Sequence, residues 1–219
     1  TDIILPEDVN GNKYHIAPAA FMDSNITSVV ISNGVISIMD SAFENCDYLE
    51  SVTISKNVEK IGVDAFYSCS SLIEVIFEEG SQVKEISECA FADCTCLESI
   101  NLEELKQLKT IGSMAFYYCE SLENITIPNT VINMDDSIFD NCRGLNTVTF
   151  EEGSQLTKIQ THTFNQCYNL SKVELPASIS EIGDYAFSNC MNLTDILIPS
   201  SITKFGYASF DNCSSLEGI

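Results

Sequence analysis

Cysteine is the residue in this chain whose side chain could take part in catalysis, in redox chemistry and in metal binding. Ten are present, and thiols can attack substrates, form disulfides or bind zinc. Eight of them follow a phenylalanine by three residues: Cys46, Cys69, Cys94, Cys119, Cys142, Cys167, Cys190 and Cys213. Side chains at one phase of a repeat point in parallel, so their sulfurs do not converge. We therefore interpret them as small buried hydrophobic residues, which predicts reduced thiols and little loss of stability for Cys119→Ala.

The remaining cysteines and the acidic pairs do not form a recognisable site. Cys89 and Cys96 flank Cys94 without a zinc-type spacing and without a fourth ligand, so we expect no metal site. The acidic pairs at 78–79 and 151–152 lie three repeats apart and cannot form one catalytic carboxylate pair. We expect solvated loops there, with weak surface calcium binding as the alternative.

The histidines do not indicate a catalytic site either. The chain has two, His15 and His162, and the sequence pairs neither with a nucleophile. The motifs G-x-S-x-G, H-E-x-x-H and G-K-[ST] are absent. The sequence therefore predicts no catalytic residues, no cofactor-binding residues and no enzyme.

A repeated element positions all of these residues. Phenylalanine recurs at intervals of 22 to 25 residues, and such a period indicates stacked coils. The nine positions are Phe21, Phe43, Phe66, Phe91, Phe116, Phe139, Phe164, Phe187 and Phe210. We expect one domain over 1–219, a solenoid of about nine repeats of 22–25 residues. The atypical residues 1–20 are expected to cap its N-terminal end, with a hairpin turn at Asn10 and Gly11.

The phase of the apolar residues predicts the structure of each coil. L-x-x-V-x-I ends with period-two apolar positions, as in a strand with one buried face. Stacking such strands gives a parallel sheet, which we place on the concave side of a right-handed leucine-rich-repeat solenoid. Short strands and single helical turns holding Ala-Phe are expected elsewhere, so the fold is mostly β.

The consensus A-F-x-x-C-x-x-L-x-x-V-x-I-P resembles the BspA-like leucine-rich repeats. The resemblance runs from Ile16 to Ile219 and departs from the pattern at Ile138, Thr163 and Ser209, where alanine is usual. It implies a secreted or cell-surface protein with an adhesin-like binding role, and it carries no catalytic residues with it. The implied partner is a host matrix or cell-surface protein.

Charge excludes some partners. Ten basic residues stand against 32 acidic ones, a net charge of -22, and a polyanion repels nucleic acid. Apolar residues never run unbroken for about 18 positions, so we expect no membrane insertion. We expect a monomer.

The candidate partner-binding face consists of the strand residues that point away from the core. Alternation along L-x-x-V-x-I places the flanking residues outside. They are Ser51, Thr53, Glu74, Ile76, Ser99, Asn101, Asn124, Thr126, Thr147, Thr149, Lys172 and Glu174, with Ser28, Val30, Asp195 and Leu197 extending the row. The row is mostly small and uncharged, so the acidic charge is expected on the loops and the outer side. Serine and threonine also simply suit strands. The leading function is non-enzymatic protein binding; the alternatives are a structural spacer and an enzyme domain.

Overall fold

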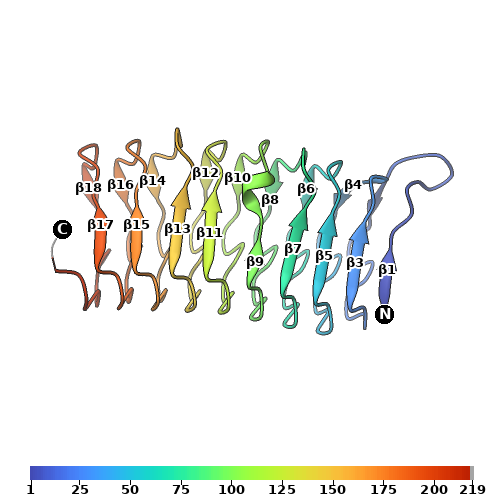
Figure 1. Ribbon diagram of the computed structural model, residues 1–219, viewed down its shortest axis with the longest axis horizontal. Coiled ribbons are helices and arrows are strands. Elements are labelled where there is room, and N and C mark those ends of the chain that lie inside the picture. The colour runs from blue at the N-terminus through green and yellow to red at the C-terminus, as the bar shows by residue number, and fades with distance from the viewer. Residues whose placement is uncertain (218–219) are drawn as a thin grey trace.

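A computed structural model describes residues 1–217 of the chain. It is an elongated stack of coils with the two ends of the chain at opposite ends of the stack (Figure 1). Each coil runs up one strand, returns through a second short strand and closes through a turn that contains the repeated phenylalanine. The predicted parallel-strand solenoid of about nine turns is confirmed.

The longer strands form one side of the stack, here called the strand face. Its strands pair in parallel, each with the equivalent strand of the next coil. The first sheet contains β1 (Asp2–Ile4), β3 (Ser28–Ile31), β5 (Ser51–Ile54), β7 (Glu74–Phe77) and β9 (Ser99–Ile100), and the second contains β11 (Asn124–Ile127), β13 (Thr147–Phe150), β15 (Lys172–Glu174) and β17 (Asp195–Leu197). A single sheet was expected on this side, so the interruption between β9 and β11 is a correction.

The interruption has a local cause. Leu102 and Leu105 are both fully buried and lie three residues apart. A 3₁₀ turn places residues i and i+3 on the same side, and η1 (Leu102–Glu104) forms here and ends β9 early. η1 is the one helix found in residues 1–217. No helix in that range is long and apolar enough to cross a bilayer.

The short strands form the return side. One sheet contains β2 (Tyr14–Ile16), β4 (Val35–Ile38), β6 (Lys60–Ile61), β8 (Glu85–Ile86), β10 (Thr110–Ile111) and β12 (Asn133–Met134), and the other contains β14 (Lys158–Ile159), β16 (Glu181–Ile182) and β18 (Lys204–Phe205). The extra residues 78–82 and 151–155 lie between the strand face and the return side, as loops at one phase of the coil. Gly80 and Gly153 adopt left-handed φ angles of 78° and 83° in these loops.

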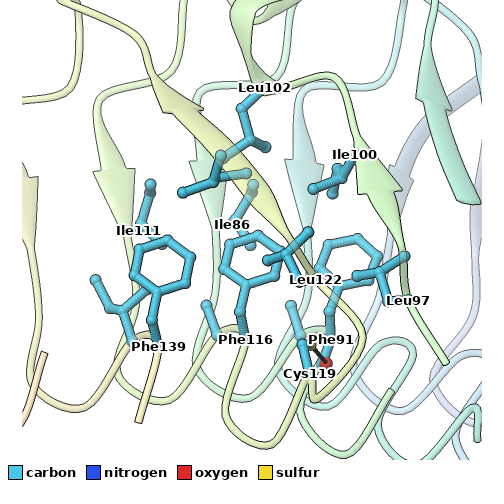
Figure 2. Close-up of a cluster of buried hydrophobic side chains, with 14 of the residues drawn as sticks. Ile86, Phe91, Leu97, Ile100, Leu102, Ile111, Phe116, Cys119, Leu122 and Phe139 are labelled. Carbon is cyan, nitrogen blue, oxygen red and sulfur yellow. Dashed lines mark hydrogen bonds between the residues drawn. The ribbon is translucent and has the colours of Figure 1, made fainter. Parts of the chain in front are cut away.

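The phenylalanines form a continuous column in the core. Neighbouring ring centroids lie 4.9–5.7 Å apart from Phe21 to Phe210, mostly with parallel planes. The seven rings from Phe43 to Phe187 are fully buried, and the two terminal rings are half-buried. The stacking of the coils that the phenylalanine spacing predicted is confirmed. Figure 2 shows three of these rings beneath the apolar side chains of the strands.

The turn side, made of the segments equivalent to Ser41–Cys46, differs from the prediction. Instead of a helical turn around Ala-Phe, two residues per coil take left-handed φ angles, such as Ser41 and Asn45 at 56° each. Polar residues of this kind tolerate that conformation best. It directs the N–H groups of Ser41, Phe43 and Asn45 toward the next coil, where three carbonyls accept them at 2.8 Å each. Bonds between coils thus replace the expected bonds within a helix.

The N-terminal residues already belong to the stack. β1 pairs with β3 and β2 pairs with β4. Between β1 and β2, Val9 and Asn12 exchange two backbone hydrogen bonds at 2.9 and 3.1 Å around Asn10 and Gly11, which have φ angles of 55° and 75°. Two consecutive left-handed residues are typical of a tight hairpin turn, so the predicted hairpin is confirmed.

Candidate partner-binding face

Alternation along the strands brings the twelve candidate side chains to the strand face. In β5, Val52 and Ile54 are buried while Ser51 and Thr53 are partly exposed. In β7, Glu74 and Ile76 are exposed in the same way, and Ile76 keeps 42% of its surface accessible. All twelve candidate residues are exposed or half-buried. The predicted orientation is therefore confirmed, and whether this face binds a partner stays a prediction.

Parallel pairing arranges these side chains in rows along the stack. Ser51 lies opposite Glu74, which lies opposite Ser99. In the second sheet, Thr126 lies opposite Thr149. Because β9 and β11 do not pair, the candidates fall into two groups, one on each sheet.

One side chain maintains the first sheet where its backbone pairing stops. The Asn101 amide accepts a hydrogen bond from the Phe77 N–H at 2.8 Å and donates one to the Phe77 carbonyl at 2.9 Å. These two bonds take the place of a backbone pair beyond the end of β9. Nothing in the alternation distinguished Asn101 from the other outward-facing residues, so this role was missed.

A hollow opens at the interruption and is here called the central hollow. It has a volume of about 380 Å³. Five of the candidate residues line it: Ile76, Ser99, Asn101, Asn124 and Thr126. The other lining residues are Val75, Ile100, Ile125, Glu98 and Glu103. It therefore combines apolar walls, amides, hydroxyls and two carboxylates.

A second, smaller hollow of about 220 Å³ lies on the other sheet and is here called the distal hollow. It is lined by Thr147, Thr149, Lys172 and Glu174, together with Val148 and Phe150. Lys172 and Glu174 form an ion pair at 2.6 Å. The ammonium group lowers the pKa of the Glu174 carboxyl through a hydrogen bond and its charge. Ser51, Thr53 and Glu74 lie outside both hollows.

The acidic charge does not avoid this face. Glu98 and Glu103 are exposed at the rim of the central hollow, and Glu123 is exposed directly before β11. These carboxylates lie in the segments that flank the strands, where the charge was expected, but at the interruption they border the strand face. The alternation rule considers only the residues within a strand, so it did not indicate that these carboxylates would border the candidate face.

The eight cysteines that follow the repeated phenylalanines, here called the ladder cysteines, lie on the turn side and also act as donors. Seven are buried, as predicted, and Cys213 in the last coil is half-buried. Each thiol donates a hydrogen bond to the carbonyl of a phenylalanine in the preceding coil. All eight do so at 3.0–3.2 Å. Figure 2 shows the bond from Cys119 to the Phe91 carbonyl oxygen. The small-hydrophobe interpretation is therefore incomplete, since it gives the thiol no polar role.

Burial also makes seven of these eight thiols poor nucleophiles, and the exception is Cys46, whose pKa is lowered to about 7 by a hydrogen bond with the Cys69 thiol. Desolvation raises the pKa of Cys119 well above its usual range and likewise raises that of Cys94. The off-ladder Cys89 has a pKa of about 11, raised by burial and then by the charges of Asp64, Glu88 and Asp93. Since the thiolate is the reactive form, the thiols with a raised pKa are suited to a structural role rather than to nucleophilic attack.

Comparison with known proteins identifies the repeat. The family model for the BspA type leucine rich repeat region matches in six copies over residues 14–108 and 104–217. This chain belongs to the BspA-type leucine-rich repeat family. A search of curated proteins found no match.

Solved structures resemble this BspA-type array over most of its length. A leucine-rich cell surface protein from Faecalibacterium prausnitzii is 26% identical with a TM-score of 0.58, covering 88% of this chain and 69% of that one. The leucine-rich repeat protein of T. pallidum is 25% identical with a TM-score of 0.59, covering 87% and 78%. The pneumococcal vaccine antigen PcpA, at 17% identity and a TM-score of 0.52 over 98% and 70%, shares the fold.

The histidines of this BspA-type array are farther apart than one site allows. His162 stacks on Tyr185 with ring centroids 5.0 Å apart, while His15 lies in the first coil. The sequence paired neither histidine with a nucleophile, and the structure adds one contact, since the Nδ1 of His15 lies 2.6 Å from the Ser37 hydroxyl. The two residues meet because β2 pairs with β4. Within residues 1–217, no other hydrogen bond orients this imidazole, as a catalytic base would need.

Proposed function

We propose that this array is the protein-binding segment of a bacterial surface protein and that it binds its partner through the strand face. The observation that supports this is the contrast in available groups. The strand face presents twelve outward side chains in rows, with two hollows between them. On the turn side, bonds between coils occupy three backbone N–H groups of each coil. Recognition needs accessible and varied side chains, and the strand face supplies them.

The proposed partner is a host matrix or cell-surface protein, and the array acts as an adhesin-like monomer outside the cell. Family membership supports this, as does the F. prausnitzii neighbour, which is described as a cell surface protein. The net charge of -22 favours a protein partner over nucleic acid.

The test is a screen of the purified chain against immobilised matrix proteins, mucins and glycans, followed by substitutions on the strand face. Ile76→Arg and Thr126→Arg place a large cation at the central hollow and should abolish binding of the captured protein. Gln82→Arg makes the same charge change in the exposed 78–82 loop and should leave binding intact. Loss of binding by the loop variant alone would move the site to the loops and refute the proposal.

A structural spacer is the second candidate function. The observation that favours it is the shape, because the ends of the chain lie at opposite ends of a long stack (Figure 1). A spacer predicts that no partner on the panel is captured and that both strand-face variants behave as the unsubstituted chain does.

A further inference from the structure

The central hollow suits a side chain with a long apolar stem. Its walls come from three strands, with Val75, Ile100 and Ile125 buried beneath and Ile76 exposed beside the opening. Lysine and arginine carry three or four methylenes that pack on apolar surface while the charged head stays at the rim. The side-chain oxygens of Asn124 and Thr126 add hydrogen-bond acceptors at the same place.

The charge at the rim is negative and uncompensated. Glu98 and Glu103 both line the hollow and are exposed. Seven ion pairs form within residues 1–217, and neither carboxylate takes part in any of them. No lysine or arginine lines this hollow.

The distal hollow provides the comparison. It lies on the same face and is also formed by neighbouring strands, but its acidic residue is already paired with a lysine of this chain. The two hollows therefore differ mainly in whether the chain supplies the cation itself.

We propose that the central hollow binds a lysine or arginine side chain presented by the protein partner. This inference rests on the proposed function and names the chemistry of the contact. The stem lies against Ile76, and the head reaches the carboxylates of Glu98 and Glu103. The charge of the whole chain attracts a basic partner over a longer range, and the hollow fixes where the cation docks.

The experiment uses a fluorescein-labelled hexalysine peptide titrated with the full chain at low salt and followed by anisotropy. Glu98→Gln with Glu103→Gln removes both rim charges and should weaken binding by about fivefold or more, because two close charge partners are lost. The matched control removes two charges elsewhere, as Glu79→Gln with Glu152→Gln, both of them exposed and outside the ion pairs. It should weaken binding by less than about twofold, the effect of a small change in overall charge.

A second readout locates the peptide. The side-chain amide signals of Asn101 and Asn124 should shift during an NMR titration, while that of Asn192, in another coil, should not. Equal weakening by the two double variants, or no shift at the hollow, would mean that the peptide binds to the overall charge, and the inference would fail. Binding of neutral glycans in place of hexalysine at these amides would also overturn it.

The two proposals fail separately. If Thr126→Arg abolishes capture of the partner while the double glutamine variant binds hexalysine unchanged, the strand face is the binding site but the cation inference is wrong. If Ile76→Arg and Thr126→Arg both leave capture intact, the proposed function itself fails. Circular dichroism spectra matching the unsubstituted chain confirm that each variant is folded.

Discussion

The turn side and the strand face of the same coil differ in how regularly they repeat along the stack. The turn side repeats without interruption: each phenylalanine ring stacks on the next, each ladder thiol bonds to the coil before it, and three N–H groups per coil bond to the coil after it. The strand face is interrupted at β9 and carries different side chains in every coil.

The turn side therefore sets how neighbouring coils align, whereas the strand face carries the side chains proposed to contact a partner. Because the turn side holds neighbouring coils together through backbone groups and one aromatic column, the strand face can lose a strand pair without breaking the stack. At the interruption Phe91 and Phe116 remain stacked, with ring centroids 5.6 Å apart. Figure 2 shows the two rings beneath the region where the strands no longer pair. The side chains that would contact a partner can therefore vary with little loss of stability in the stack.

The largest expected effect tests the aromatic column. Phe116→Ala removes a fully buried ring in contact with two others. It should reduce the free energy of unfolding by about 3–5 kcal/mol, through lost apolar burial and the cavity left behind. Urea unfolding followed by circular dichroism measures it. A loss below about 1 kcal/mol would mean that the turn side does not hold the register.

The interruption of the strand face should be less costly to disturb. Asn101→Ala leaves the Phe77 N–H and carbonyl without their side-chain partners, at a cost of about 1–3 kcal/mol. Asn124→Ala changes an exposed asparagine one coil away and is the matched control, expected within about 0.5 kcal/mol. Equal losses in the two variants would show that the amide bonds of Asn101 contribute nothing.

The thiol ladder gives a smaller and more selective effect. Cys119→Ala removes the Cys119 hydrogen bond to the Phe91 carbonyl and should cost about 1–2 kcal/mol. Cys119→Ser keeps a hydroxyl donor and should be the more stable of the two. Ser24 already occupies the equivalent position in the first repeat. If alanine proves better tolerated than serine, the cysteine serves only as an apolar filler, as the sequence alone indicated.

The smallest effect belongs to the strand face. Thr126→Arg changes a half-buried residue that points outward from β11, so the free energy of unfolding should change by no more than about 0.5 kcal/mol. Comparing its urea midpoint with that of Phe116→Ala measures the contrast directly. A comparable loss in the two variants would remove the distinction between the two sides.

The sequence predicted what repeats and missed what does not. The Phe and Cys columns were predictable because identical phases stack, and the outward row followed from strand alternation. The break at β9 was missed because Asn101 fits the alternation. The spacing of Leu102 and Leu105, typical of a 3₁₀ turn, was the available signal. The Ser37–His15 contact was missed because it depends on how two distant segments pair.

The left-handed residues were also beyond prediction. Positions two before and two after each phenylalanine hold Asp, Ser, Asn, Tyr, Met and others, so no single residue type marks them. Their conformation is set by the bonds to the adjacent coils, which a single repeat does not contain.

The hydrogen bonds of the turn side give that side of the stack a local electrical polarity, whereas bonds elsewhere in the coil, such as those from Ser55 N–H to the Ile31 carbonyl and from Gly62 N–H to the Ile38 carbonyl, run in the opposite direction. The peptide unit joining Val63 to Asp64 points its carbonyl toward the preceding coil and its N–H toward the following one, and equivalent units do the same along the array. In a β-sheet strand dipoles alternate and largely cancel, but here they add along the long axis. The negative pole faces the N-terminal end and the positive pole the C-terminal end, the reverse of an α-helix. The turn side therefore favours cations toward its first coils and anions toward its last.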